Sequence, residues 1–200
     1  AIEEEDPNAI IWIEPSSSVR TVTGPSAFWD QPLTRPQGPS QIVFAPHWYP
    51  DIYPYPGIFS TPREFNADEW LYRDFKEPLH HYLEHAPNWL GNAPVIFGEF
   101  GTYFNFEGDD DNDISSHVLN SYYEAFEALN VGSMLWCFSA ENDAEYGEHW
   151  NHEDFSIIGP DQKPRGVYSY VRPYARATSG KQIRQAFNSP YHYWDPVEGE

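Results

Sequence analysis

The chain has 200 residues, 40% of them hydrophobic, and a formal net charge of −20 from 11 basic and 31 acidic side chains. This length supports a buried core, whereas the acidic balance argues against nucleic acids and anionic membranes as partners, because both require basic patches. No apolar run approaches the ~18 residues of a membrane-spanning helix, and the single cysteine, Cys137, excludes an internal disulfide.

Four short apolar runs predict strands of a buried parallel sheet. They are AIIWI (9–13), QIVFA (41–45), PVIFG (94–98) and GSMLWCF (132–138). Each run is short enough for a strand, and polar or turn-forming residues follow it.

Three helical patterns accompany these strands. The first begins at Asn66, where NADE resembles a capping box with Glu69, and Pro78 is expected to kink or break it. The second follows Asp113, and the third is predicted over about 165–177. The expected inner stripe of the third helix is Val167, Tyr170, Val171 and Tyr174.

Alternating strands and helices predict an α/β fold. The first strand is followed by EPSSS rather than a glycine-rich phosphate turn, so a (β/α)8 TIM-type barrel fits better than an open doubly wound sheet. Functional residues of such barrels follow the strands, as Glu14, His47 and Glu99 do here, and Trp136 ends the fourth strand.

Four strand–helix units make only half of a barrel that takes about 250 residues. We therefore expect residues 1–179 to be half of a barrel and the chain to be incomplete at both ends. Residues 180–200 are predicted to be a linker and the first strand of a truncated β domain.

The sequence PVIFGEFG places the carboxylate of Glu99 directly after an apolar run. An unpaired carboxylate is costly inside a core, so Glu99 is either paired for structural reasons or sits at a strand mouth and performs chemistry. His47 and Tyr49 are two residues apart and point the same way on an extended backbone. This spacing fits two interpretations. The two side chains bind a carboxylate or a sugar, or the histidine is structural, with its hydrogen bonds satisfied inside the protein, and the tyrosine packs beside it.

The segment after the fourth strand is rich in polar and aromatic residues. Trp136 offers a flat face for a sugar ring, and the loop beyond it is either functional or a solvated loop anchored by Trp150. His149, His152 and Glu153 lack the spacing of a known metal motif. No metal and no organic cofactor is predicted.

Three motifs in this order carry a family resemblance: HWY, IFGEFG and the long LWCFSAEND…HWNHEDFSI. Together they resemble glycoside hydrolase family 5, in clan A of the (β/α)8 glycosidases. The last motif and the following RPYARATSGKQIRQAFN look most like the endoglycoceramidase and steryl-glucosidase branch, in which a β-sandwich follows the barrel. The resemblance implies that this chain represents about the last four βα units and the start of the sandwich.

The resemblance also implies the roles of individual residues. Glu99 matches the nucleophile at the end of strand seven, and His47 and Tyr49 match the pair beside it. The expected substrate-binding residues are Trp136, Trp150, Asn142, Asn151 and Trp48.

The chain departs from the family pattern at the general acid/base, which is a Glu in an Asn-Glu-Pro motif at the end of strand four. The one Glu-Pro here is Glu14-Pro15, preceded by Ile13 and about one strand–helix unit before His47. Glu14 therefore matches strand five, and the acid/base is expected upstream of Ala1. The alternative is that Glu14 performs this role.

The sequence thus predicts a retaining β-glycoside hydrolase for β-glucosides such as glycolipids or β-glucans. Its expected partners are a carbohydrate or glycolipid substrate and the missing N-terminal half of the barrel, without which the chain is expected to be inactive or poorly folded. The alternative is a non-catalytic carbohydrate-binding remnant of a barrel. Localisation is left open, with an extracellular one slightly favoured.

Overall fold

The structure, a computed structural model, describes residues 2–15, 33–38, 41–49, 75–105, 111–150 and 153–191. Its elements in chain order are α1 (Ile2–Glu5), β1 (Ile11–Ile13), β2 (Ile42–Phe44), α3 (Lys76–Leu90), β3 (Ile96–Phe100), α4 (Asp113–Leu129), β4 (Gly132–Leu135) and α5 (Val167–Tyr170).

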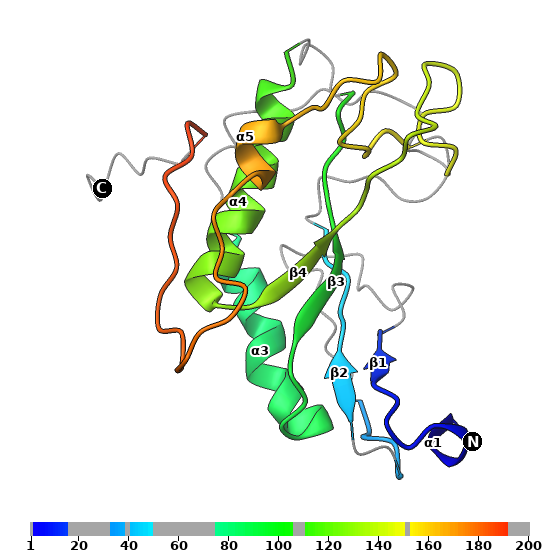
Figure 1. Ribbon diagram of the computed structural model, residues 1–200, viewed down its shortest axis with the longest axis vertical. Helices are drawn as coiled ribbons and strands as arrows, with labels where there is room; N and C mark the ends of the chain where they lie inside the picture. Colours follow the sequence, from blue (N-terminus) through cyan, green and yellow to red (C-terminus); the bar gives the residue numbers. More distant parts are fainter. Residues whose placement is uncertain are drawn as a thin grey trace.

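The four predicted strands are present, and every pairing between them is parallel. β1 pairs with β2 and β3 pairs with β4, while parallel bridges from Phe44 to Val95 and from His47 to Glu99 link β2 to β3. Their carboxyl ends all point upward in Figure 1. The described strands form two parallel pairs and no closed barrel, so the architecture shown is α/β with parallel strands.

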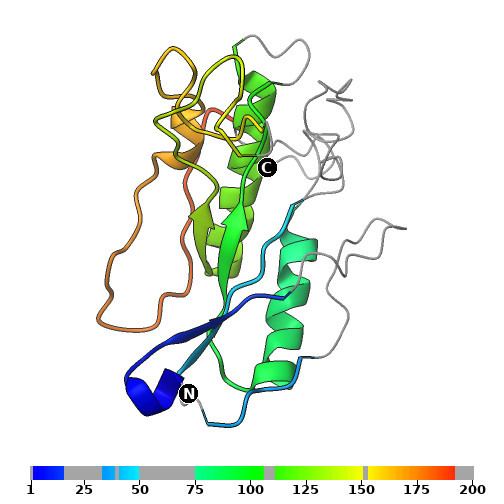
Figure 2. The same cartoon turned by 90° about the vertical axis from the view of Figure 1, so that its right-hand side faces the viewer.

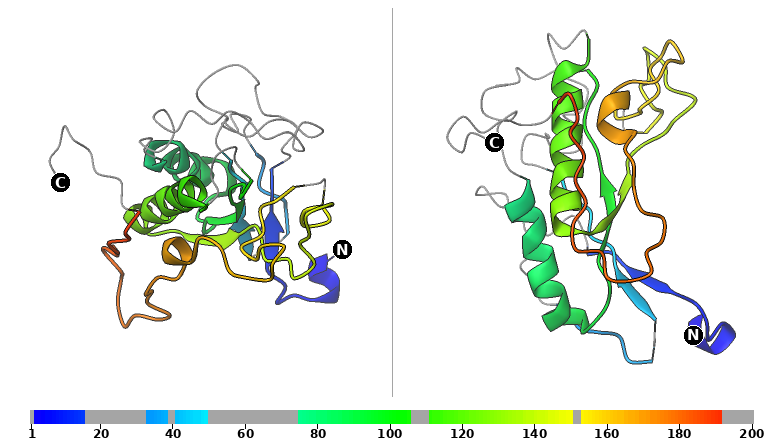
Figure 3. Two further views of the ribbon diagram at one scale, coloured as in Figure 1. Left: turned by 90° about the horizontal axis from the view of Figure 1, so that it is seen from above. Right: turned by 60° about the vertical axis from the view of Figure 1, so that its left-hand side comes forward.

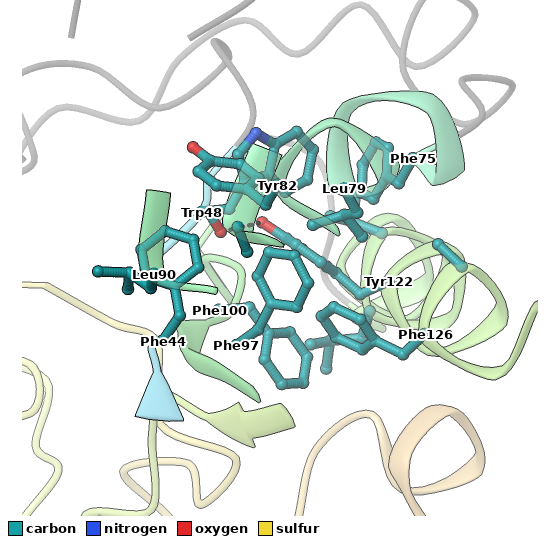
Figure 4. Packing of buried hydrophobic residues seen from close by; sticks show 14 of the residues in the cluster. Phe44, Trp48, Phe75, Leu79, Tyr82, Leu90, Phe97, Phe100, Tyr122 and Phe126 are labelled. Atoms are coloured by element: carbon teal, nitrogen blue, oxygen red, sulfur yellow. Dashed lines mark hydrogen bonds between the residues drawn. The ribbon is translucent and has the colours of Figure 1, made fainter. Parts of the chain in front are cut away.

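Helices α3 and α4 lie side by side on one side of the strands (Figures 1 and 3). Between them and the strands lies an aromatic core (Figure 4). In it, Phe97 of β3 contacts Tyr82 of α3 at a ring separation of 5.7 Å and Phe126 of α4 at 5.3 Å. Much of the aromatic content of the sequence therefore stabilises the core, since each such ring buries a large apolar area.

The strands are not equally buried. All three residues of β2 are buried, but β1 and β4 expose Trp12 and Met134. β1 and β4 are the outer strands of the described set and have a described neighbour on one side only. The prediction of strands buried on both faces is therefore wrong for these two.

Helix α4 begins at Asp113 as predicted and buries Val118, Tyr122 and Phe126 along one face. Helix α3 begins at Lys76, and the expected start at Asn66 lies outside the described residues. Pro78 lies in the first turn of α3, where a missing N–H leaves no intrahelical hydrogen bond unmade. Whether it kinks or breaks a helix that begins at Asn66 stays a prediction, because residues 50–74 lie outside the described part of the chain.

The third predicted helix is much shorter than expected. α5 ends at Tyr170, and both Val171 and Tyr174 of the expected inner stripe are exposed. The reason is local: Pro173 disfavours a helical conformation of Arg172 and cannot donate an intrahelical hydrogen bond.

Residues 171–191 form no helix or strand and run along α4 (Figure 3, right). Arg172 forms a buried ion pair with Glu127 of α4, with Nε 2.8 Å from Oε1. Asn120 Nδ2 donates to the carbonyl of Tyr191 at 2.9 Å. This segment is thus part of the same packing unit, and the β domain expected over 180–200 stays a prediction.

The loop between β4 and α5 lies at the end of the molecule toward which the strands point, opposite α1 (Figure 2). This end is where the polar side chains that follow the strands gather. Among the described residues, no helix has the length and apolar character needed to cross a bilayer.

Candidate active site

Glu99 lies near the end of β3, where the pairing with β4 is irregular between Phe97 and Phe100. Its side chain is 25% exposed, and Tyr49 Oη donates a hydrogen bond to its Oε1 at 2.5 Å. Local irregularities in a strand often redirect a side chain beside a site. The carboxylate is therefore partnered and also open to solvent.

Three strand ends converge at His47. Its Nδ1 lies 3.4 Å from Glu99 Oε2 and 3.2 Å from Glu14 Oε1. Glu14 follows β1, His47 follows β2 and Glu99 ends β3, so the parallel order of the strands brings these groups together. The pairing of His47 and Tyr49 on one side of the chain, expected from their spacing, is present.

Two glycines make this arrangement sterically feasible. A Cβ on Gly98 would lie 3.2 Å from Cδ2 of His47 and 3.0 Å from the carbonyl oxygen of Ala45. A Cβ on Gly101 would collide with the carbonyl oxygen of Trp136. The glycines on both sides of the carboxylate thus allow the strand to approach β2 and β4 closely.

We expect Gly101→Ala to lower the free energy of unfolding by about 1–3 kcal/mol or more, because a backbone group must move to admit the methyl group. Gly180→Ala is the matched control, since nothing lies within 4 Å of its added Cβ. Urea unfolding of both variants measures the difference. Equal midpoints for the two would contradict this close approach.

Two tryptophans form an aromatic surface at the same end of the molecule. The rings of Trp136, at the end of β4, and Trp150, on the following loop, meet edge to face with centroids 6.5 Å apart. Trp150 is 58% exposed. Such rings can stack on the apolar face of a sugar.

The assignment of Trp48 to substrate binding is wrong. Its ring is buried and packs edge to face against Phe75 at 5.3 Å and Tyr122 at 5.5 Å. Side chains alternate along an extended backbone. The spacing that directs His47 and Tyr49 to the site therefore directs Trp48 into the core (Figure 4).

The assignment of Asn142 is wrong for a similar reason. Asn142 is buried, and its Nδ2 donates to Asp154 Oδ1 at 3.1 Å and to the carbonyl of Ile158 at 2.7 Å. It therefore holds the loop together instead of facing a ligand. Asn151 lies outside the described residues.

His149, the described histidine of the polar loop, pairs with Asp143 at 2.7 Å. Hydrogen bonds from the backbone of Tyr146 and Glu145 and from His149 lower the pKa of Asp143. Within the described ranges, no group of three His, Cys, Asp or Glu side chains is arranged to hold a metal ion. His152 lies outside those ranges.

Sequence reasoning missed Glu148. This carboxylate is 6% exposed and accepts hydrogen bonds at 3.0 Å from Trp136 Nε1, Cys137 Sγ and the backbone N–H of Phe155. Burial raises its pKa, and these hydrogen bonds oppose that shift. No sequence signal marks it, because it is one of several acidic residues in a polar loop.

No family model matches the chain. The ergosteryl-β-glucosidase of Saccharomyces cerevisiae is 36% identical over 95 residues, which cover 44% of this chain and 12% of the yeast protein. A glucosylceramidase of Rhizopus delemar is 23% identical over 190 residues, which cover 74% of this chain and 28% of that protein.

Solved structures show the same likeness in fold. Sterylglucosidase 1 of Cryptococcus neoformans superimposes with a TM-score of 0.72 at 17% identity, over 94% of this chain and 31% of that one. A lactosyl-enzyme intermediate of endo-glycoceramidase II from Rhodococcus sp. gives a TM-score of 0.54 at 21% identity, over 90% and 34%.

The chain therefore spans about a third or less of the length of these proteins. The similarity in sequence and the similarity in fold point to one group of enzymes, which is the group that the motifs around His47, Glu99 and Trp136 resemble. By sequence the chain is similar to part of an ergosteryl-β-glucosidase and of a glucosylceramidase, and by fold it is similar to part of sterylglucosidase 1 and of endo-glycoceramidase II.

Proposed function

We propose that this chain carries the nucleophile side of a retaining β-glycosidase site, built on part of a (β/α)8 barrel. The observation that carries the proposal is the convergence of Tyr49, Glu99, His47 and Glu14 at the ends of neighbouring parallel strands. Catalytic groups at the carboxyl ends of strands are typical of barrel enzymes. The likeness in fold to sterylglucosidase 1 supports the barrel.

In the proposed mechanism, Glu99 attacks the anomeric carbon and displaces the leaving oxygen, which gives a covalent glycosyl-enzyme. Water then attacks the same carbon and releases both the sugar and the Glu99 carboxylate. The hydrogen bond from Tyr49 holds the attacking carboxylate in one rotamer. His47 contacts the second oxygen of Glu99, so both oxygens are oriented.

The proposed substrates are β-glucosides of lipids. The relatives' names specify ergosteryl β-glucoside and glucosylceramide, both of which join glucose to a large apolar group. Trp136 and Trp150 supply aromatic faces beside the strand ends, suited to the sugar ring. This substrate class fits the relatives better than β-glucan chains do.

A retaining glycosidase also needs a second carboxyl group, ~5–5.5 Å from the nucleophile, to protonate the leaving oxygen. Glu14 is one candidate, because it shares Nδ1 of His47 with Glu99. We favour a group outside these 200 residues, since Glu14 lacks the Asn-Glu-Pro context and is half exposed. In that case Glu14 orients His47, and His47 in turn orients the carboxylate of Glu99.

Glu14→Gln tests this assignment with two β-glucosides, one with a dinitrophenolate leaving group and one with an alkoxide. We expect the unmodified chain to cleave only the dinitrophenyl glucoside, which needs no acid, and its rate to fall about tenfold in Glu14→Gln, the equivalent of one hydrogen bond to a charged group. Initial rates on both substrates measure this, with Glu84→Gln on α3 as the control. A selective loss of ~10²–10⁴-fold on the alkyl glucoside would instead identify Glu14 as the general acid.

A further inference from the structure

We propose that Glu148 is a positioning residue of this site. It fixes the plane of the Trp136 indole and the position of Phe155, which packs against Tyr49 beside Glu99. This role rests on the proposed glycosidase function. Glu148 lies on the loop between β4 and α5, eleven or twelve positions from the strand end that it contacts.

Both oxygens of Glu148 are used. Oε1 accepts the indole N–H of Trp136, and Oε2 accepts the thiol of Cys137 and the backbone N–H of Phe155, each at 3.0 Å. The carboxylate is almost fully buried. A buried carboxylate persists only where hydrogen bonds compensate its lost hydration, and here the compensating donors come from the strand end and from the loop.

The contact with Trp136 determines the orientation of a ring. An indole has one N–H, and a hydrogen bond to it within the ring plane fixes the rotation of the ring. A freely rotating ring would have to be ordered each time a sugar binds, and that ordering would weaken binding. The structure therefore presents the proposed sugar platform already ordered.

The contact with Phe155 links Glu148 to the proposed nucleophile through Tyr49. The ring of Phe155 packs edge to face against Tyr49 at 5.7 Å and lies 4.3 Å from the ring of Tyr103. Tyr49 in turn donates its hydroxyl to Glu99. One buried carboxylate thus supports both the aromatic platform and the tyrosine that orients Glu99.

Glu148→Gln is the sharpest substitution, because it keeps the shape and replaces one acceptor oxygen with an NH₂ group. All three partners donate hydrogen bonds to Glu148, so the new NH₂ group must face at least one donor and that hydrogen bond is lost. We expect the KM for an activated aryl β-glucoside to rise about tenfold through Trp136, and kcat to fall about threefold through Phe155 and Tyr49. The exposed Glu141 on the same loop gives the matched control, Glu141→Gln.

A double-mutant cycle separates this role from a general loss of packing. Trp136→Phe keeps an aromatic face and removes the N–H that Glu148 accepts. If Glu148 acts through this hydrogen bond, Glu148→Gln raises KM less than threefold in the Trp136→Phe background. Full additivity of the two changes in KM would overturn the proposal.

The chain's single cysteine provides a test that needs no turnover. Burial, and then the hydrogen bond to Glu148 and its charge, raise the pKa of the Cys137 thiol. In Glu148→Gln we expect the pH midpoint of alkylation by iodoacetamide to move to lower pH, because the anionic neighbour is gone. General loosening would also move the midpoint to lower pH, because it relieves the burial of the thiol, and it would in addition raise the limiting rate at high pH; a raised limiting rate therefore overturns the proposal.

The two sets of measurements fail separately. Glycoside hydrolysis that is unchanged in Glu99→Gln overturns the proposed function and leaves the alkylation test intact. An alkylation midpoint that does not respond to Glu148→Gln overturns the role of Glu148, whatever the hydrolysis assays show.

Discussion

Glu99→Gln is expected to reduce hydrolysis of an activated aryl β-glucoside by roughly 10⁴-fold or more, because the amide cannot form the glycosyl-enzyme. The substitution keeps the size of the side chain and leaves an oxygen that can accept from Tyr49. The measurement is the initial rate of phenolate release by the 200-residue chain, with the melting temperature as a check on folding. Glu84→Gln on α3 should retain full activity.

A second substitution identifies the chemical step. Glu99→Ala leaves space beside the anomeric carbon, and added azide should attack there in place of the carboxylate while the phenolate leaves. One displacement inverts the configuration, so the product should be an α-glucosyl azide. A β-glucosyl azide would assign Glu99 to the acid/base role instead and contradict our assignment.

The same experiment examines the alternative function, a carbohydrate-binding remnant of a barrel. The exposed ring of Trp150 beside Trp136 suits sugar stacking with or without catalysis. Glycoside binding by the folded chain, measured by calorimetry, with no turnover of any aryl glucoside would favour the binding module. Turnover that survives Glu99→Gln would contradict both functions as assigned.

Arg172→Ala is expected to lower the free energy of unfolding by about 3–5 kcal/mol, because it leaves the buried carboxylate of Glu127 without its partner. The two side chains are only 4% and 9% exposed. Arg172 also donates to Asn120 Oδ1 at 2.6 Å and to the carbonyl of Phe187 at 3.2 Å. Urea unfolding measures the loss, and limited proteolysis should show earlier cleavage within 171–191.

Two controls test whether the loss comes from the unpaired buried charge. Lys163→Ala removes an exposed ion pair with Asp161 and should leave stability unchanged, since exposed pairs contribute little. The double change Arg172→Met with Glu127→Met should destabilise less than Arg172→Ala, because no buried charge is left unpaired. An Arg172→Ala variant as stable as Lys163→Ala would show that the C-terminal segment does not depend on this contact.

Much of the fold follows from local patterns. The apolar runs and the periodicity of α4 predict those elements correctly, because a strand or an amphipathic helix is encoded in consecutive residues. The same holds for His47 and Tyr49, whose shared direction depends only on an extended backbone. The third helix was predicted too long because its apolar spacing continues past Pro173, which ends the helical conformation.

In the candidate site, too, some features follow from local sequence and others only from tertiary packing. By itself the sequence determined that Glu99 follows a strand and that aromatic residues accompany it. The tertiary structure decided which groups meet: Glu14 and Glu99 reach one nitrogen of His47 only because β1, β2 and β3 lie side by side. Burial likewise decided that Glu148 supports Trp136, since hydrogen bonds between a loop and a distant strand end depend on packing and leave no periodic pattern in the chain.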